Sequence, residues 1–487
     1  MAEDELIAQR KEKLERLRSL GIDPYPHRFS PTHTAAQAAA LTPEDGTGPE
    51  VTVAGRVTAL RDMGKATFVD LRDGSGRIQA YFKQDTIGES TYPVLKEIDL
   101  GDFIGVSGPL FRTKTKEPTV EARTLTVLTK ALRPPPEKWH GLQDVEARYR
   151  HRYLDLMANE EVRRIFQVRS KTVSTIRSYL DDQGYLEVET PILQGTAGGA
   201  AARPFVTHHN ALDRDFFLRI SLELHLKRLV VGGFDRVYEM GRVFRNEGVS
   251  TKYNPEFTML ELYEAYADYN RMMELAEALV SAIAREVLGA TKVQAGDVEI
   301  DLSPPWPRLP MREAIRERCG VDFEAHGNAE SLRKATAETG VHVEPQWGRG
   351  KLIDELLTAH VEPHLQQPTF IVDYPVELSP LAKRKVDDPG LVERFELFIA
   401  GREAANAFTE LNDPIDQRER FEEQARLRAA GDDEAEVADE DFLVALEHGM
   451  PPAGGMGIGI DRLLMALTGV TSIREVILFP ALRERNE

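Results

Sequence analysis

Residues 241–263 read Gly241-Arg-Val-Phe-Arg-Asn-Glu-Gly248, a short loop, and then Asn254-Pro-Glu-Phe-Thr-Met-Leu-Glu-Leu-Tyr263. Side chains two residues apart point to the same face of a β-strand, so a strand here places Phe257, Glu261 and Tyr263 together. A glutamate among inward-facing residues is unusual for a strand that only packs against a core. The pattern therefore predicts a strand that contributes to a binding site.

Two further segments have features that a nucleotide site needs. Residues 165–191 predict a long helix, a glycine cap and a strand, while residues 455–467 combine glycines with Arg462 at the start of an apolar helix. Small residues allow a ligand or another backbone to approach closely. The sequence contains no Gly-x-x-x-x-Gly-Lys-Ser/Thr loop, and residues 454–459 do not fit the dinucleotide pattern. We therefore expect arginines on a sheet to hold any bound nucleotide.

The charge of the chain limits how it can bind nucleic acid. The 487 residues include 61 Lys+Arg and 80 Asp+Glu, a formal net charge of -19. Such a balance argues against binding by bulk positive charge, so any RNA contact must be local, and no DNA partner is expected.

The sequence also indicates a compartment. Its first residues are acidic where a secretory signal would be basic, and no apolar run approaches the roughly 18 residues of a membrane span. Cys319 is the one cysteine, which excludes an internal disulfide and a cysteine-built zinc site. We expect a cytoplasmic protein without a membrane partner.

Short β-type runs with glycine turns indicate a small barrel of the oligonucleotide-binding (OB) kind near the start of the chain. A five-stranded sandwich would give the same pattern. The runs are residues 51–57, 66–71, 78–82, 103–107 and 123–128.

Proline and helix patterns set the domain boundaries. Pro134-Pro-Pro136 can continue neither a helix nor an inner strand, so residues 134–144 are expected to form a linker. The expected organisation is a helical extension at 1–50, the barrel at 51–133 and a second domain at 145–487. Within that domain, residues 271–365 predict a mainly helical insertion.

Three segments together resemble the sequence motifs of the class II aminoacyl-tRNA synthetases. Phe244-Arg-Asn-Glu-Gly248 and Gly457-Ile-Gly-Ile-Asp-Arg462 are similar in particular to the bacterial-type lysyl enzymes of the aspartyl-like subgroup. The resemblance implies an α+β multidomain protein with an OB barrel and a class II domain on an antiparallel sheet flanked by helices. The matching segments are residues 165–191 as motif one, 237–266 as motif two and 455–467 as motif three.

The resemblance implies an ATP site in which Arg245 and Arg462 are the catalytic residues. Arg245 would contact the α-phosphate and the substrate carboxylate, while Arg462 and Phe257 would cover the two faces of adenine. A planar guanidinium suits both tasks. Tyr253 stands where lysyl enzymes commonly carry histidine, so we expect altered nucleotide affinity. The implied ATP-binding residues are Arg245, Glu247, Tyr253, Asn254, Phe257, Glu396, Gly459 and Arg462.

The resemblance also implies magnesium, bound by Glu396 and Glu403. Magnesium usually takes one or two protein carboxylates and completes its shell with phosphates and water. The two glutamates are an odd number of residues apart, which would put them on opposite faces of one flat strand. We expect a bulge at Gly401 to bring them together.

Acidic residues suggest the amino acid that is activated. Asn406, Phe408 and Glu410 alternate, so a strand would present an amide, an aromatic wall and a carboxylate on one face. That combination suits lysine, whose methylene stem needs apolar cover and whose ammonium needs an acceptor. With the resemblance, the lysine-binding residues are Gly199, Glu223, Arg245, Glu261, Tyr263, Asn406, Phe408 and Glu410.

Three barrel positions match residues with which this subgroup reads the central anticodon base: Phe68, Gln79 and Glu117. Stacking and edge hydrogen bonds suit single-stranded RNA loops. The expected partners are therefore lysine, ATP and tRNA(Lys), and the family implies a homodimer joined through motif one. Three alternatives remain open: an aspartyl- or asparaginyl-specific relative, a paralogue that modifies a protein, and a non-catalytic RNA-binding module.

Overall fold

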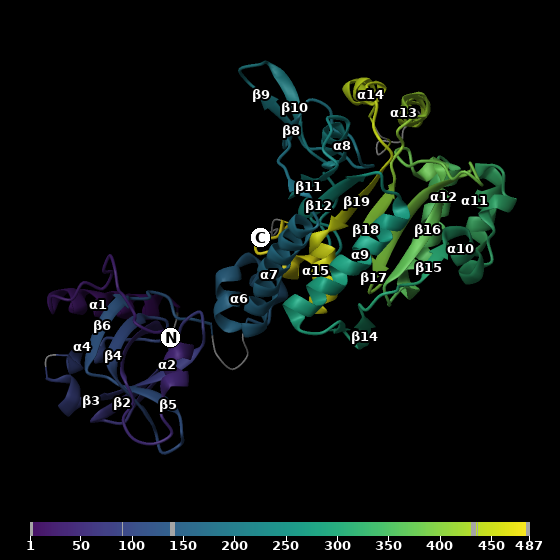
Figure 1. Cartoon of the computed structure of the whole chain (residues 1–487). Helices are drawn as coiled ribbons and strands as arrows, with labels where there is room; N and C mark the ends of the chain where they lie inside the picture. Colours follow the sequence, from purple (N-terminus) through teal and green to yellow (C-terminus); the bar gives the residue numbers. More distant parts are fainter. Residues whose placement is uncertain (1–2, 90, 137–141, 430–434, 436, 484–487) are drawn as a thin grey trace. The chain divides into compact units, whose positions relative to one another are not determined.

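The computed structural model describes residues 3–89, 91–136, 142–429, 435 and 437–483 (Figure 1). The chain divides into two compact units, residues 1–143 and 144–487, which have separate hydrophobic cores. Residues 137–141 of the expected linker lie outside the described residues.

Five strands of the first unit close into a ring. Strand β1 pairs with β4 through its first half and with β2 through its second half, and β3 and β5 complete the circuit. Apolar residues such as Val53, Ile78 and Ile104 fill its interior. The elements are β1 (Glu50–Asp62), β2 (Ala66–Arg72), β3 (Arg77–Lys83), α3 (Gln84–Ile87), α4 (Tyr92–Lys96), β4 (Phe103–Arg112), β5 (Pro118–Glu121) and β6 (Thr124–Thr129).

The prediction of a five-stranded OB barrel is confirmed, but the membership of the ring differs. The run expected at 123–128 is β6, which pairs only with β4 and lies outside the ring. The fifth member is β5, which no pattern predicted. Its four residues begin with a proline and are too few to show a period of two.

Two helices precede the barrel, α1 (Glu3–Ser19) and α2 (Ala35–Leu41). The basic residues of α1 hold it to its own unit: Arg10 donates to the carbonyls of Ala131 and Leu100, both at 2.9 Å, and Lys13 lies 2.6 Å from Asp99. Arg10 and Lys13 are therefore engaged in contacts within this unit.

An eight-stranded sheet forms the centre of the second unit, in the order β15-β16-β17-β18-β19-β12-β11-β7. A separate sheet of three short strands has the order β8-β10-β9. The strands are β7 (Leu186–Glu187), β8 (Leu193–Gln194), β9 (Val206–His209), β10 (Arg214–Leu218), β11 (Arg236–Phe244), β12 (Glu256–Ala265), β15 (Arg308–Pro310), β16 (Thr369–Pro375), β17 (Leu391–Ile399), β18 (Arg402–Thr409) and β19 (Ala453–Gly459).

The large sheet is antiparallel through its middle, as the family resemblance implied, but parallel at both edges. Strands β7 and β11 are parallel, and so are β15 and β16. Parallel neighbours need a crossover connection. Three strands and a helix separate β7 from β11 along the chain, and three helices separate β15 from β16, so the sheet is mixed.

Helices cover both faces of the sheet. Figure 1 shows α7, α9 and α15 along one face, where they share a core with Leu260 and Leu262 of β12. On the other face, α8, α14 and Phe421 of α13 pack near Tyr263, and α10 and α12 pack against β16 and β17. The helices are α5 (Val145–Arg150), α6 (Arg152–Ala158), α7 (Glu160–Asp182), α8 (Glu223–Val231), α9 (Tyr269–Ile283), α10 (Met311–Cys319), α11 (Ala329–Glu338), α12 (Arg349–His360), α13 (Pro414–Ala429), α14 (Glu440–Glu447), α15 (Ile460–Thr468) and α16 (Ile473–Val476).

The segment 271–365, expected as a helical insertion, has two parts. Helix α9 places Met272, Leu275 and Leu279 in the main core, so it belongs to the layer that covers the sheet. A π-turn, the strands β13 (Lys292–Ala295) and β14 (Val298–Asp301), β15 and α10 to α12 follow it. Among the described residues, no helix is both long and apolar enough for a membrane span.

Candidate active site

The hairpin of β11 and β12 positions the first catalytic candidate. Arg245 directly follows β11, and its backbone amide donates to the carbonyl of Pro255 at 2.8 Å, which closes the loop between the strands. Its guanidinium lies 5.2 Å from the ring centre of Phe257 and donates to the carbonyl of Ile220 at 3.3 Å. Burial lowers the pKa of Arg245, and the carboxylates of Glu247 and Glu403 oppose that effect. The other guanidinium nitrogens therefore remain available for an anionic ligand.

Arg462 belongs to the same site and lies in the first turn of α15. Its Nη1 lies 2.7 Å from Oε2 of Glu403, and its guanidinium is 5.9 Å from the ring of Tyr253. Burial lowers the pKa of Arg462, but the carboxylate of Glu403 outweighs it, so the net shift is upward. Tyr253 thus stacks beside an arginine expected to contact phosphate, and its side chain is 46% exposed.

The remaining candidates for ATP binding differ in whether their side chains are free to contact a nucleotide. Asn254 is buried, donates to the carbonyl of Glu256 at 2.6 Å and accepts from the amide of Ala481 at 3.0 Å, so its side chain holds the loop in place. Glu247 is exposed on that loop. A side chain at Gly459 would meet Arg462 only at ordinary contact distance, so steric need does not explain that glycine.

A residue of α7 connects the two sides of this site. Arg169 lies 2.5 Å from Oδ1 of Asp461, and its other nitrogen donates to the hydroxyl of Thr258 at 2.9 Å. Oδ2 of Asp461 accepts from the amide of Thr258 at 2.7 Å. These bonds hold the residues next to Phe257 and Arg462, and they could not be predicted because the partners are far apart in the chain.

Glu396 and Glu403 lie on neighbouring strands of one hairpin, β17 and β18. Ala400 and Gly401 form the turn between them, both with positive φ, and Glu403 lies opposite Phe398. Residues 396 and 398 share a face of β17, so the turn alone places both glutamates on that face. The expected bulge at Gly401 is therefore wrong.

A bulge does occur in β18, at Ala404. Leu397 pairs with Ala405 while Phe398 pairs with Glu403, which leaves Ala404 as the extra residue. An extra residue shifts the alternation by one. Glu403 can therefore share a face with Asn406 although an odd number of positions separates them.

The environment of the two glutamates suits a hard cation. Oε1 of Glu396 lies 2.5 Å from Arg394, and burial raises the pKa of Glu396 to about 7, with a further increase from the carboxylate of Glu403. A bound cation would relieve both effects. The described residues hold no group of three or more metal-ligating side chains, so two carboxylates need ligands from the substrate.

The candidate lysine pocket contains three buried glutamates. Glu261 accepts from the amide of Leu222 at 2.9 Å and from the hydroxyl of Tyr263 at 3.3 Å. Glu223 begins α8 and is 8% exposed, and Glu410 is fully buried. Burial raises the pKa of Glu261 to about 7 and that of Glu410 to about 8, and neighbouring carboxylates add to both shifts.

Lys227, which the sequence did not single out, is fully buried among these acids. Its Nζ lies 2.6 Å from Oε1 of Glu223 and 2.5 Å from Oε2 of Glu410. Its spacing of four residues from Glu223 on a helix was the one signal in the sequence. The partnership with Glu410 joins residues far apart in the chain and was not predictable.

The second oxygen of Glu410 has a different situation. Neither oxygen of Glu410 makes a hydrogen bond within the described residues although both are buried, but Oε2 has the ion pair with Lys227 and Oε1 has no charged partner there. A Cβ atom at Gly455 would overlap it and the ring of Tyr263. Motif three thus needs a glycine there because the pocket side chains occupy the space over the strand.

Three further lysine-binding candidates are Gly199, Asn406 and Phe408. Gly199 has φ +82, and a side chain there would overlap the hydroxyl of Ser221 beside Glu223. Asn406 accepts from Nε of Arg394 at 3.0 Å, and the same arginine holds Glu396. Phe408 lies 5.2 Å from Nζ of Lys227.

The barrel candidates form a platform beside a polar network. The ring of Phe68 is half-buried, lies outside the barrel core and is 4.8 Å from that of Tyr81, which also contacts Phe111. Gln79 is buried and accepts from the hydroxyl of Thr119 at 3.2 Å. Glu117 accepts from Arg77. Tyr81 and Phe111 extend the aromatic surface beyond the one ring that the sequence indicated.

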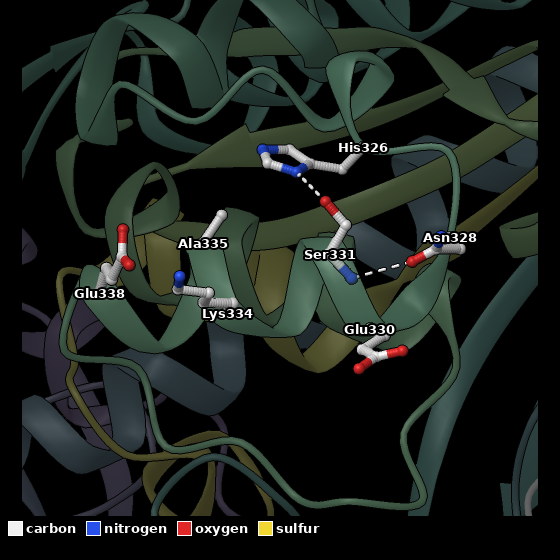
Figure 2. Close-up of a pocket in the computed structure, with 7 residues that line it drawn as sticks. All are labelled: His326, Asn328, Glu330, Ser331, Lys334, Ala335 and Glu338. Carbon is white, nitrogen blue, oxygen red and sulfur yellow. Dashed lines mark hydrogen bonds between the residues drawn. The ribbon is translucent and has the colours of Figure 1, made fainter.

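A hollow lies elsewhere, along α11 from the residues before its first turn to its last residue. Figure 2 shows that Ser331 joins its hydroxyl to Nδ1 of His326 at 2.7 Å, and its amide donates to Oδ1 of Asn328 at 2.9 Å. Asn328 is the N-cap of α11, so these polar groups stabilise the helix start. None of the candidate site residues lines it.

Comparison with known proteins agrees with this arrangement. Residues 144–483 match the family model described as tRNA synthetases class II (D, K and N), and residues 51–128 match the OB-fold nucleic acid binding domain. A lysine–tRNA ligase of Moorella thermoacetica is 59% identical, covering 100% of this chain and 99% of the relative. That of Bacillus subtilis is 54% identical over 98% of this chain and 97% of its own length. The chain therefore belongs to the lysine–tRNA ligases of the class II tRNA synthetases.

Proposed function

We propose that this chain activates L-lysine with ATP, releases pyrophosphate, and transfers the lysyl group to the 3′-terminal adenosine of tRNA(Lys). The observation that carries the choice of amino acid is the buried oxygen Oε1 of Glu410, which lacks a partner among the described residues. A buried carboxylate oxygen without a donor is costly, so the site calls for a ligand that brings one.

The pocket chemistry favours lysine over the other amino acids of this family model. The ε-ammonium would donate to Glu410, the methylene stem would lie along Phe408, and Glu223 and Glu261 would accept from the α-ammonium. An aspartate or asparagine side chain would bring oxygen atoms toward Glu410, where like charges or lone pairs repel. Gly199 leaves room for the α-amino end because its backbone lies beside Glu223.

Adenylate formation needs positioning and neutralisation of charge. The substrate carboxylate oxygen attacks the α-phosphorus, and the bond to pyrophosphate breaks. Arg245 would hold the carboxylate and the α-phosphate together, while Arg462 would contact the γ-phosphate and, with Phe257, enclose the adenine. Tyr253 and Glu247 would contact the nucleotide at the mouth of the site, and Asn254 and Gly459 would shape its wall.

Glu396 and Glu403 would hold Mg²⁺, because they share a face and repel each other when both are ionised. Magnesium would neutralise phosphate charge and orient the leaving pyrophosphate. Arg394 and Arg462 now pair with these glutamates, so they would turn toward phosphate oxygens when the cation is present.

Pyrophosphate exchange tests the choice of amino acid. Exchange supported by lysine, and by neither aspartate nor asparagine, is the expected result, and equal exchange with aspartate would contradict the pocket. A magnesium titration tests the metal site: Glu403→Ala should need a higher magnesium concentration for half-maximal exchange, whereas Glu393→Ala, on the same hairpin, should not.

The barrel would read the anticodon with Phe68, Gln79 and Glu117, and motif one would join two copies of the chain. Sedimentation of the purified protein at several concentrations tests the homodimer. A cytoplasmic location is part of this proposal, because the proposed activity supplies charged tRNA for translation.

A further inference from the structure

We propose that Lys227 is a positioning residue for lysine recognition: it supplies an internal positive charge that favours the carboxylate form of Glu410 and directs one oxygen of that carboxylate toward the substrate. The inference rests on the proposed lysine pocket. The supporting observation is geometric. Nζ of Lys227 lies 2.6 Å from Glu223 and 2.5 Å from Glu410, and the side chains of Lys227 and Glu410 are fully excluded from solvent.

The orientation of Glu410 follows from this contact. Oε2 is held by Lys227, and Oε1 is left on the side of Gly455 and Tyr263. Phe408 and Phe442 lie 5.2 and 5.8 Å from Nζ and restrict the ammonium to this place. A carboxylate with one oxygen fixed presents the other at a defined position, which lowers the entropy lost when a ligand binds.

The balance of charge gives the second reason. The groups facing Glu410 are Lys227 and Glu223 of α8 and Glu261 of β12, with Tyr263 beside them. Arg245 would pair with the substrate carboxylate and so does not neutralise the acids of the pocket. Three ionised glutamates and the positive charge of Lys227 then leave two negative charges. The α- and ε-ammonium groups of lysine match that number. Without Lys227, one glutamate would have no counter-charge in the closed pocket and would favour the protonated form.

The test is the Michaelis constant for lysine in pyrophosphate exchange, measured from pH 7 to pH 9 at saturating ATP. Lys227→Met should raise the Michaelis constant for lysine about tenfold or more at pH 7. Such a change corresponds to an increase of about one or more in the pKa of Glu410. The increase should shrink toward pH 9, where Glu410 ionises without help. The Michaelis constant for ATP should change little. A value for lysine within about twofold of wild type at pH 7, or an increase that is constant with pH, would overturn the inference.

Lys130 provides a matched control. It too is fully buried between two carboxylates, 2.6 Å from Asp99 and 2.8 Å from Asp102, but in the barrel unit. Lys130→Met should lower thermal stability and leave pyrophosphate exchange unchanged. If it altered exchange as Lys227→Met does, the effect would be general destabilisation and the inference would fail.

A second comparison removes dependence on one variant. Glu223→Gln is compared with the double variant Glu223→Gln/Lys227→Met. The double variant removes one carboxylate together with the lysine, so it leaves fewer charged groups without a partner. It can therefore be used if Lys227→Met does not fold. The double variant should bind lysine more weakly than Glu223→Gln at pH 7, with the difference falling at pH 9; equality would overturn the inference. If Glu410→Gln does not change the Michaelis constant for lysine, the proposed lysine pocket is wrong. If Glu410→Gln changes it but Lys227→Met does not, only the inference about Lys227 is wrong.

Discussion

The two oxygens of Glu410 show how burial gives a single residue its function. Oε2 is ion-paired with Lys227 at 2.5 Å, Oε1 has no such pair, and neither buried oxygen makes a hydrogen bond within the described residues. Desolvation of this kind is tolerated when a ligand completes the hydrogen bonding, as happens at many functional sites. Glu261 differs, because one of its oxygens accepts from the amide of Leu222 and the other from the hydroxyl of Tyr263.

Replacing Glu410 by glutamine keeps the shape of the pocket and removes its charge. We expect a loss of about 3 kcal/mol, roughly a hundredfold in kcat/KM for lysine, because a buried ammonium loses its carboxylate. The Michaelis constant for ATP should stay near the wild-type value. Glu264→Gln is the control, since Glu264 is also buried on β12 but bonds to Tyr185 and Arg236 outside the pocket. Equal effects of the two substitutions on lysine would contradict the assignment.

Lysine binding should also depend on pH. The pKa values of Glu261, about 7, and Glu410, about 8, are raised above the ordinary value of a glutamate, so both gain protons as the pH falls through that range. A protonated carboxyl attracts an ammonium group weakly. The Michaelis constant for lysine, measured at saturating ATP and magnesium, should therefore fall as the pH rises from 6 to 8.5, by up to roughly tenfold per unit. A flat profile in this window would show that the acids stay ionised.

Arg245 makes one side-chain hydrogen bond in the described structure, to the carbonyl of Ile220 at 3.3 Å. Its loss should therefore cost little stability but remove the charge that faces the reacting phosphate. Arg245→Ala should lower the rate of lysine-dependent exchange by roughly a hundredfold to a thousandfold, as expected for a donor aimed at the transition state. The exchange rate of Arg245→Lys should lie between those of the wild type and Arg245→Ala, because lysine keeps the positive charge and lacks the planar guanidinium. Near-normal exchange in a folded Arg245→Ala protein would remove this residue from the mechanism.

At the scale of elements, the hairpin of β17 and β18 brings the metal and lysine residues to one face. Its turn places Glu403 opposite Phe398, and the bulge at Ala404 restores the alternation needed by Asn406 and Phe408. The strand conformation and the shared face of Asn406 and Phe408 could be predicted from the sequence. The turn could not, because Ala400 is an uncommon residue in a left-handed conformation.

That turn can be tested by stability. Ala400 has φ +55 and Gly401 has φ +69, a pair of conformations that favours Asn-Gly. Ala400→Asn should raise the free energy of unfolding by about 0.5–1 kcal/mol, and Gly401→Ala should lower it by about 1–2 kcal/mol, since alanine tolerates a positive φ poorly. Chemical denaturation measures both. Opposite signs are the expected outcome; a stabilised Gly401→Ala variant would mean that the turn has another conformation.

Other elements show where sequence patterns stop. The long apolar period of α7 and the alternation of β12 are local features, and both were predictable. Strand β5 was missed because four residues carry no period, and the edge pairs of the large sheet follow from crossovers rather than from any local pattern. The contacts of Lys227, Arg169 and Arg394 join distant segments, so only the folded chain reveals them.

At the scale of the whole molecule, the chain forms two compact units with separate cores, and the residues proposed for the two recognition tasks divide between them. All residues assigned to lysine, ATP and magnesium belong to residues 144–487, and those assigned to the anticodon belong to residues 1–143. The chemistry of the first step should therefore proceed without the barrel, while the second step should also depend on the residues proposed to bind tRNA.

Phe68→Ala tests that division, because the ring is half-buried, lies outside the barrel core and packs on Tyr81 at 4.8 Å. Lysine-dependent pyrophosphate exchange should be unchanged. Loss of a base-stacking aromatic costs roughly 1–3 kcal/mol, so tRNA charging at limiting tRNA should fall about tenfold or more, with partial recovery at saturating tRNA. With a tRNA whose central anticodon base is replaced, wild type and variant should converge, since the stacking and edge contacts are already lost. Phe82→Ala is the contrast: that ring is fully buried in the barrel core, and its removal should unfold the unit. If Phe68→Ala unfolds the barrel as well, the residue is part of the core; if it charges tRNA normally, another surface reads the anticodon.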